Sequence, residues 1–149
     1  MNTDATRDLA RALMDEHGLK DWTLAFDRAK NRAGNCIRKQ RTISLSKPLM
    51  SLWTTGQVRD TILHEIAHAL TPDDRGHGRE WRVMCRKIGA DPTRTWGHDG
   101  ERQIEGKHLG TCPSGHTIRR HRRSKARVSC SMCNSAGFDS RYLFTWKEA

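Results

Sequence analysis

Two histidines and a glutamate are the first residues in this chain whose types and spacing could perform chemistry. His64 and His68 are four residues apart in a segment of helical periodicity, so both rings project from one helix face and could share a metal ion. Imidazole suits zinc, and a hydrolytic zinc site keeps three protein ligands and one open position for water. Glu65 would lie beside the ion without binding it, where its carboxylate can take a proton from that water. The spacing therefore predicts a zinc-dependent hydrolase with Glu65 as its general base.

The third ligand of this site is predicted to be His77, nine residues beyond His68 and at the start of the next predicted helix. Gly76 and Gly78 flank it, and we expect their backbone freedom to bring the ring back over the first helix. Weaker candidates are Glu80, His98 and His108. Asp60, one turn before His64, is either a surface carboxylate or a partner that orients the His64 ring.

A second set of metal-binding residue types lies near the end of the chain. Cys112 and His116 form C-x3-H, and Cys130 and Cys133 form C-x2-C. Two such knuckles hold a tetrahedral structural zinc with no open position. A segment this short cannot build an adequate core, so the metal would supply its folding energy. The first knuckle lacks a second cysteine, and His108 and His121 could replace His116 as the fourth ligand.

Charge is distributed unevenly along the chain. Residues 1–105 carry a net charge of +3, whereas residues 106–138 hold seven Lys/Arg and no acid. Such a segment needs nearby anions, and phosphate backbones fit. We expect DNA, single-stranded or distorted, to bind there, with Tyr142, Phe144 and Trp146 either stacking on bases or packing on the segment. The predicted contacts are Arg119, Arg120, Arg122, Arg123, Lys125 and Arg127.

The elements that must position these residues can be read from periodicity and turn signals. Helices are predicted over 3–16, 57–70 and 78–88, with Trp81 and Cys85 in the buried stripe of the last helix. Strands are predicted over 22–26, 36–38 and 42–46, with a turn ending at Gly34 and with Pro48 closing the region. The fold class is therefore α+β. The predicted domains are a catalytic domain at 1–95, a linker at 96–108 and a basic zinc-binding subdomain at 109–149.

Composition and cysteine number indicate the cellular location in which the protein works. No apolar run is long enough for a membrane span, and the N-terminal segment reads as an amphipathic helix and not as a secretory signal. The five cysteines are an odd number, which argues against a disulfide framework. Cys36 and Cys85 are predicted to be buried in the core. We expect a monomer in the cytoplasm, associated with the nucleoid or acting in the cytoplasm of a host cell.

These motifs together resemble the SprT-like family, which includes the Spartan proteases. The resemblance is carried by His64-Glu65-Ile66-Ala67-His68-Ala69, by Gly76-His77-Gly78 followed by Trp81, by Gly89-Ala90-Asp91-Pro92, and by Thr117-Ile118-Arg119-Arg120-His121. It implies a small zincin catalytic domain with a zinc-ribbon-like subdomain behind it, and so one catalytic and one structural zinc ion. It also implies a DNA-stimulated metalloendopeptidase that degrades proteins bound or crosslinked to DNA. By position, His64, His68 and His77 would bind the catalytic zinc, and Glu65 would be the general base.

Two further functions are compatible with the same residues. One is a zinc-dependent DNA-binding protein whose protease motif is unused or regulatory. The second is a processing protease for one specific protein, for example in virus assembly, that does not need DNA. Cleavage that responds to DNA would favour the DNA-stimulated protease over both.

Overall fold

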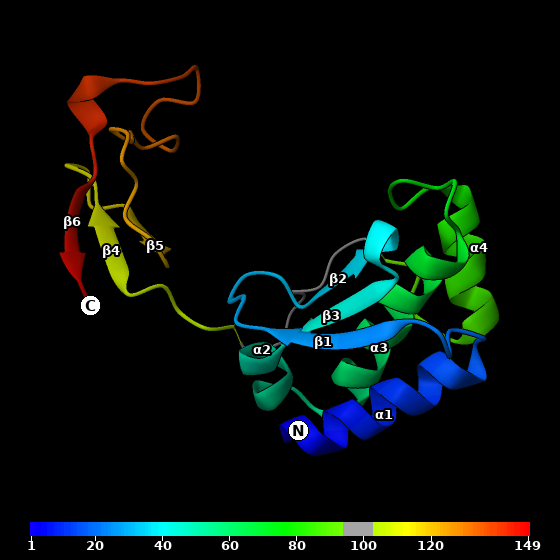
Figure 1. Cartoon of the computed structure of the whole chain (residues 1–149). Coiled ribbons are helices and arrows are strands. Elements are labelled where there is room, and N and C mark those ends of the chain that lie inside the picture. Colours follow the sequence, from blue (N-terminus) through cyan, green and yellow to red (C-terminus); the bar gives the residue numbers. More distant parts are fainter. Residues whose placement is uncertain (94–102) are drawn as a thin grey trace. The chain divides into compact units, whose positions relative to one another are not determined.

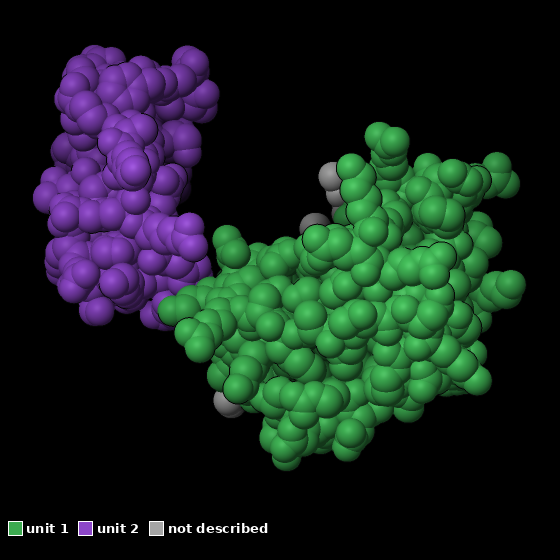
Figure 2. Space-filling view, in the orientation of Figure 1, with its two compact units in different colours: residues 1–103 green, residues 104–149 purple. Residues whose placement is uncertain are grey.

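The computed structural model describes residues 1–93 and 103–149. The chain separates into two compact units, one ending at Gln103 and the other beginning at Ile104 (Figure 2). Helices and small sheets occur together, which confirms the predicted α+β class. Residues 96–102 of the predicted linker, and with them His98, lie outside the described residues.

The first unit is built on a three-stranded sheet with the order β1-β3-β2 (Figure 1). Its strands are β1 (Thr23–Asp27), β2 (Gly34–Ile37) and β3 (Thr42–Ser46). The outer strand β1 runs parallel to β3, whereas β2 is antiparallel to β3 and pairs Cys36 with Ile43. A short 3-10 helix, η1 (Arg38–Gln40), joins β2 to β3. Because β2 pairs only with β3 in this sheet, its other edge is left for neighbouring groups.

Helices α1 (Thr3–Glu16) and α3 (Thr55–Leu70) pack on the sheet and on each other. The side of α3 that faces the sheet is apolar, and Ile62, Leu63 and Ile66 on it are almost fully buried. Thr54 caps α3 together with the Gln57 side chain in a capping box, which fixes where the helix begins. The chain then forms α4 (Arg79–Ile88), whose Trp81 and Cys85 are completely buried, as predicted.

Two local predictions in this unit were wrong, and the structure shows why. Pro48 does not close the strand region but stands in the first turn of a short helix, α2 (Lys47–Leu52), where its missing N–H costs nothing. Gly34 does not end a turn but begins strand β2, where it pairs with Leu45 of β3, and a glycine is needed there because the Glu65 side chain approaches its backbone closely.

The second unit contains a three-stranded antiparallel sheet of order β5-β4-β6. Its strands are β4 (His108–Thr111), β5 (Thr117–Arg120) and β6 (Thr145–Glu148), with the 3-10 turn η2 (Ser140–Tyr142) before β6. Apart from its cysteines, few of its side chains are buried, so this unit has little apolar core of its own. Across the described residues of both units, no helix combines the length and apolarity needed to cross a membrane.

Candidate metal centres

Three histidine rings converge in the first unit. The Nε2 atom of His77 lies 3.1 Å from that of His64 and 3.2 Å from that of His68. A neutral imidazole nitrogen offers either one proton or one lone pair, so His77 Nε2 cannot form two good hydrogen bonds at once. A tetrahedral zinc with bonds of about 2.0–2.1 Å separates its ligand nitrogens by about 3.3 Å. The observed spacing therefore fits a shared metal ion better than a hydrogen-bonded cluster.

The protonation of these rings also suits a metal. Burial first, and then the charges of His68 and His77, lower the pKa of His64 to about 3. Burial likewise lowers the pKa of His68 to about 4, with His77 and Arg38 acting in the same direction. Both rings are therefore neutral near neutral pH, which is the form that binds zinc.

Glu65 is the buried carboxylate of the site and is only 7% exposed. Burial raises its pKa to about 7, although the positive charge of Arg32 and a hydrogen bond from the Cys36 backbone N–H oppose that shift. A carboxylate with its pKa near the working pH can both accept and return a proton. Gly34 makes room for this group, because a Cβ there would lie 2.7 Å from Glu65 Oε1.

Trp81 lies against all three histidine rings. The centroid of its ring is 4.7 Å from that of His64, 4.5 Å from that of His77, and 5.3 Å from that of His68, on which it is stacked. Its indole N–H donates to the His64 carbonyl oxygen at 3.4 Å. Because Trp81 is fully buried, it limits how far the rings can move. The sequence predicted Trp81 as a core residue, but its contact with the rings was missed.

Asp74 organises the loop that carries His77. Its carboxylate accepts the backbone N–H groups of Gly76 at 3.2 Å, Gly78 at 3.1 Å and Trp81 at 3.0 Å. These bonds, first of all the one from Trp81, hold the pKa of Asp74 below its usual range. The carboxylate thus fixes the loop to the start of α4.

The two glycines beside His77 do not act as predicted. Neither has a positive φ, so the turn does not need their backbone freedom. Gly78 is required for space instead, since a Cβ there would lie 2.6 Å from an oxygen of Asp74. A side chain at position 78 would displace the group that holds the His77 loop.

Arg38 fastens the same loop to the end of α3. Its Nε donates to the His68 carbonyl at 3.1 Å, and its Nη2 donates to the carbonyls of Thr71 at 3.3 Å and Asp74 at 2.9 Å. A cation at a helix C-terminus also interacts favourably with the helix dipole. No local sequence pattern pointed to Arg38, because its partners are at least thirty residues away.

A cavity of about 470 Å³ opens in front of the histidines, and Glu65, Arg38 and Arg75 line it together with strand β2. Cys36 also lines the cavity and is only partly buried, so the prediction of a core position for it was wrong. Burial raises the pKa of Cys36 to about 11.

Two acids were considered for the first site, and one of them, Asp60, lines the cavity that contains the three rings. Glu80 is exposed on α4, and the group of possible metal ligands formed by the histidines does not include it. The Asp60 carboxylate accepts the Asp91 N–H at 2.7 Å. Its observed contact is therefore with the segment that follows α4.

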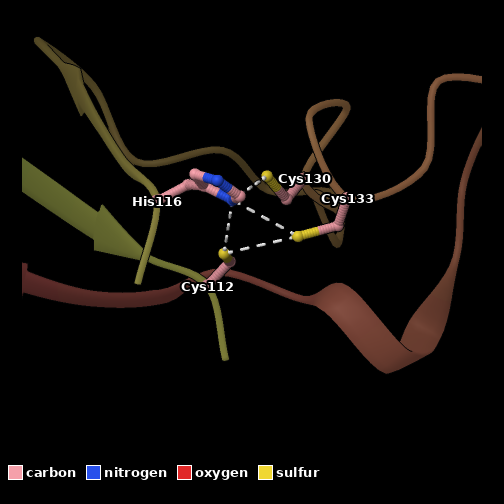
Figure 3. Close-up of side chains that lie close together, drawn as sticks. All are labelled: Cys112, His116, Cys130 and Cys133. Atoms are coloured by element: carbon pink, nitrogen blue, oxygen red, sulfur yellow. Dashed lines mark hydrogen bonds between the residues drawn. The ribbon is translucent and has the colours of Figure 1, made fainter. Parts of the chain in front are cut away.

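The second unit brings its predicted ligands together (Figure 3). His116 Nδ1 lies 3.5, 3.6 and 3.4 Å from the sulfurs of Cys112, Cys130 and Cys133, and the sulfurs of Cys112 and Cys133 are 3.8 Å apart. A tetrahedral zinc with bonds of about 2.3 Å to sulfur and 2.0 Å to nitrogen requires about 3.8 Å between sulfurs and about 3.6 Å from sulfur to nitrogen. His108 is buried in β4, and neither it nor His121 belongs to this cluster.

Cys112 is prepared to act as a thiolate ligand. Burial alone would raise its pKa, but hydrogen bonds from the backbone N–H groups of His116 and Ser114, with weaker help from Cys133 and His116, lower the pKa to about 7. Metal binding requires the thiolate form. The cluster therefore fits zinc both in its spacing and in its chemistry.

The basic strip, residues 119–127, begins within strand β5 and is mostly exposed. Arg119 pairs with Glu105 at 3.4 Å, and Arg120 lies over the Trp146 ring. The remaining predicted contacts, Arg122, Arg123, Lys125 and Arg127, form no ion pair within the described residues.

A hollow of about 440 Å³ lies beside the strip, with Phe144 and Trp146 next to Arg123, Lys125 and Arg127. The two aromatic rings also contact each other. They therefore pack on the unit and at the same time face a space with basic side chains around it.

The sequence of this chain is similar to those of SprT-like proteins. The model of the SprT-like family matches residues 4–101. Protein SprT of Glaesserella parasuis serovar 5 (strain SH0165) is 28% identical over 78 residues, which are 50% of each chain, so this chain spans about half the length of that curated relative.

Two solved structures are also similar. They are the metallopeptidase zymogens jannalysin of Methanocaldococcus jannaschii and abylysin of Pyrococcus abyssi. The jannalysin match has a TM-score of 0.48 and 15% identity, and it covers 64% of this chain and 85% of that one. The abylysin match has a TM-score of 0.47 and 18% identity, and it covers 56% and 78%.

Proposed function

Because the chain belongs to the SprT-like family, we propose that it is a zinc-dependent metalloendopeptidase with a zincin-like catalytic unit. The convergence of three imidazole nitrogens beside the buried Glu65 carboxylate carries this proposal. His64, His68 and His77 are the zinc ligands in it, and the cavity in front of them takes the substrate.

Glu65 is the proton carrier of the proposed reaction. Bound zinc supplies a Lewis acid for the scissile carbonyl and for the attacking water. The Glu65 carboxylate removes a proton from that water and returns it to the amine that leaves. The hydrogen bond from the Cys36 N–H and the space at Gly34 hold the carboxylate in place. The three rings are held in their observed positions by the contacts of Trp81, Asp74 and Arg38.

The free edge of β2 is best suited to binding a peptide substrate. The Ser46 N–H donates to the Ala33 carbonyl, so the alternation of an antiparallel pair turns the backbone groups of Gly34 and Cys36 away from β3. Cys36 uses its N–H on Glu65, and among the described residues the Gly34 N–H and both carbonyls have no backbone partner, so they can pair with a ligand. An extended peptide can pair with such an edge as an added strand, and both residues line the cavity.

The substitution Glu65→Gln tests this assignment, because it keeps the size of the side chain and removes its basicity. The variant is expected to keep its zinc content and melting temperature and to lose cleavage of an unstructured protein such as casein. If Glu65→Gln cleaves as fast as the parent, Glu65 is not the general base.

The second unit is proposed to be a zinc-ribbon-like module that binds DNA and stimulates cleavage. Cys112, His116, Cys130 and Cys133 would hold a structural zinc, and the strip would contact phosphates. The hollow beside it places aromatic rings next to cations, which favours single-stranded or distorted DNA whose bases can stack. The proposed substrates are proteins bound or crosslinked to DNA, and the proposed setting is the cytoplasm, with the protein as a monomer.

Charge-neutral variants of the strip test the DNA part. Arg122→Gln/Arg123→Gln is expected to bind DNA more weakly and to lose stimulation by DNA, while it cleaves free casein at the parent's rate. If the parent cleaves a DNA-binding protein equally fast with and without added DNA, the enzyme is a processing protease that works without DNA. If the parent binds DNA and cleaves nothing, the motif is unused.

A further inference from the structure

The outer face of α4 carries cations in a row. Arg79, Arg82 and Arg86 follow each other at spacings of three and four residues, so they share one face of the helix. All three side chains are exposed. We call them the α4 arginine row. It belongs to the first unit and is separate in sequence from the basic strip (Figure 1).

The arginines of the row form no ion pair with the residues that the structure describes, unlike the arginines of α1. On α1, Arg7 pairs with Asp4 and Arg11 pairs with Asp15, each at 2.7 Å. Within the described residues, no ion pair involves any arginine of the α4 row. Glu80 is the one acid of α4 and lies about 100° around the helix from Arg79. The row therefore presents uncompensated positive charge to solvent.

Helix stability does not account for the whole row. Arg86 is in the last turn of α4, where a cation is favourable, but Arg79 is the first residue of the helix, where the dipole disfavours one. A cation kept at the unfavourable end, which forms no ion pair with any described residue, points to a partner outside the chain.

The position of the row relates it to the cavity. Arg75, four residues before Arg79, lines the cavity that contains the histidines, and α4 begins directly after the His77 loop. A polyanion bound along α4 would therefore lie on the catalytic unit that contains the cavity, although the row itself does not line the cavity.

We propose that the α4 arginine row is a second nucleic-acid surface, which holds the phosphate backbone on the unit that contains the catalytic cavity. From Arg79 to Arg86 the helix rises about 10 Å, enough for successive phosphates of one strand. Guanidinium groups bind phosphate oxygens with two parallel hydrogen bonds. The row thereby keeps a DNA-bound protein at the cavity and lowers the KM for such substrates, with no effect on a free peptide. This inference rests on the proposed DNA-stimulated protease function.

Two triple variants test the row. Arg79→Gln/Arg82→Gln/Arg86→Gln removes it with little change in helix propensity. The matched control, Arg28→Gln/Lys30→Gln/Lys39→Gln, removes the same charge from exposed cations elsewhere in the unit. Binding of labelled oligothymidine is measured by fluorescence anisotropy over a range of KCl concentrations. Cleavage of free casein and of a DNA-bound protein is measured in parallel.

The α4 variant is expected to bind at least tenfold more weakly and to lose about 2 from the slope of log K against log salt, at about 0.7 for each phosphate contact. Its KM for the DNA-bound protein rises while its cleavage of free casein stays at the parent's rate, and the control behaves as the parent. If the α4 variant and the control lose DNA affinity and salt slope equally, the inference is overturned, since the change in net charge alone then explains the losses. Competition by polyglutamate as effective as that by oligothymidine also overturns it, in favour of an acidic protein partner.

The failures of the two proposals can be told apart. If the strip variant loses DNA binding and the α4 variant keeps the parent's affinity and slope, the DNA-stimulated function stands and the α4 surface is wrong. If the parent itself binds no oligothymidine, both the DNA-stimulated function and the α4 nucleic-acid surface are wrong. If casein is not cleaved by the parent, the protease assignment fails, whatever α4 binds.

Discussion

Gly34→Ala is expected to damage catalysis far more than it damages the fold. In the structure, a Cβ at position 34 would lie 2.7 Å from both Cγ and Oε1 of Glu65 and 2.9 Å from Cδ. Ordinary contact requires at least 3.4 Å, so the Glu65 side chain must retreat by about 0.7 Å. A displacement near 1 Å at a reacting group can cost about a hundredfold in rate. We therefore expect kcat/KM to fall about ten- to hundredfold.

The fold should tolerate the same change. Gly34 does not have a positive φ, so alanine brings no backbone strain, and the atoms it meets belong to a side chain that can move. The gain from restricting the unfolded chain is about 0.4–1 kcal/mol, which offsets part of the overpacking. The free energy of unfolding is expected to stay within about 1 kcal/mol of the parent's.

The assay compares casein cleavage per mole of zinc-loaded protein with the midpoint of urea unfolding. Gly56→Ala is the matched control, because the nearest atom to its new Cβ is 4.0 Å away in the first turn of α3. That control should keep full activity and gain about 1 kcal/mol of stability. Parental kcat/KM in Gly34→Ala, with zinc fully bound, would refute the claim that Gly34 sets the position of Glu65.

The other predictions concern the support of each metal site. Trp81→Leu should lower the free energy of unfolding by about 2–4 kcal/mol and weaken zinc binding at the histidines; unchanged zinc affinity in a competition titration would mean that the indole does not restrain the rings. Asp74→Asn should also weaken that affinity, since the carboxylate accepts N–H groups on both of its oxygens whereas an amide has one accepting oxygen and an NH2 group that only donates; a zinc affinity equal to the parent's in the same titration would contradict this. Cys133→Ser should lower the zinc content from two ions per chain to one and disorder the second unit by NMR, while casein cleavage persists; two ions in the variant would exclude the four-ligand site. A chelator should abolish cleavage before it unfolds the second unit, because a site with an open position exchanges its metal more easily than a closed one, and the reverse order would count against the assignment of the two sites.

Several features could be predicted from local patterns, because neighbouring residues determine them. The helical period placed His64 and His68 on one face, and the observed α3 confirms that helix. The spacing of Cys112, His116, Cys130 and Cys133 predicted one group, and the structure brings these four together. The assignment of both groups as zinc ligands stays a prediction, as does the domain division, and the resemblance to the SprT-like family is confirmed.

Other features depend on segments that are far apart in the chain. Arg38 was missed because the carbonyls it holds belong to a helix end and a loop that only the fold brings to it. Cys36 was misplaced because a strand pattern does not tell whether a residue faces the core or a cavity. The short α2 was missed because Pro48 is equally suited to ending one element and starting another.

The sequence by itself determined which residues could do chemistry here: the two histidines and the glutamate of α3, the later His77, and the three cysteines and one histidine that are grouped in the second unit. Their types and spacings are local, and so they can be read along the chain. Only the tertiary structure decided how the first group is held. Gly34 is needed because Glu65 approaches it, Gly78 because Asp74 does, and Trp81 because three rings rest on it. Such requirements arise from close packing between distant segments, and no local pattern records them.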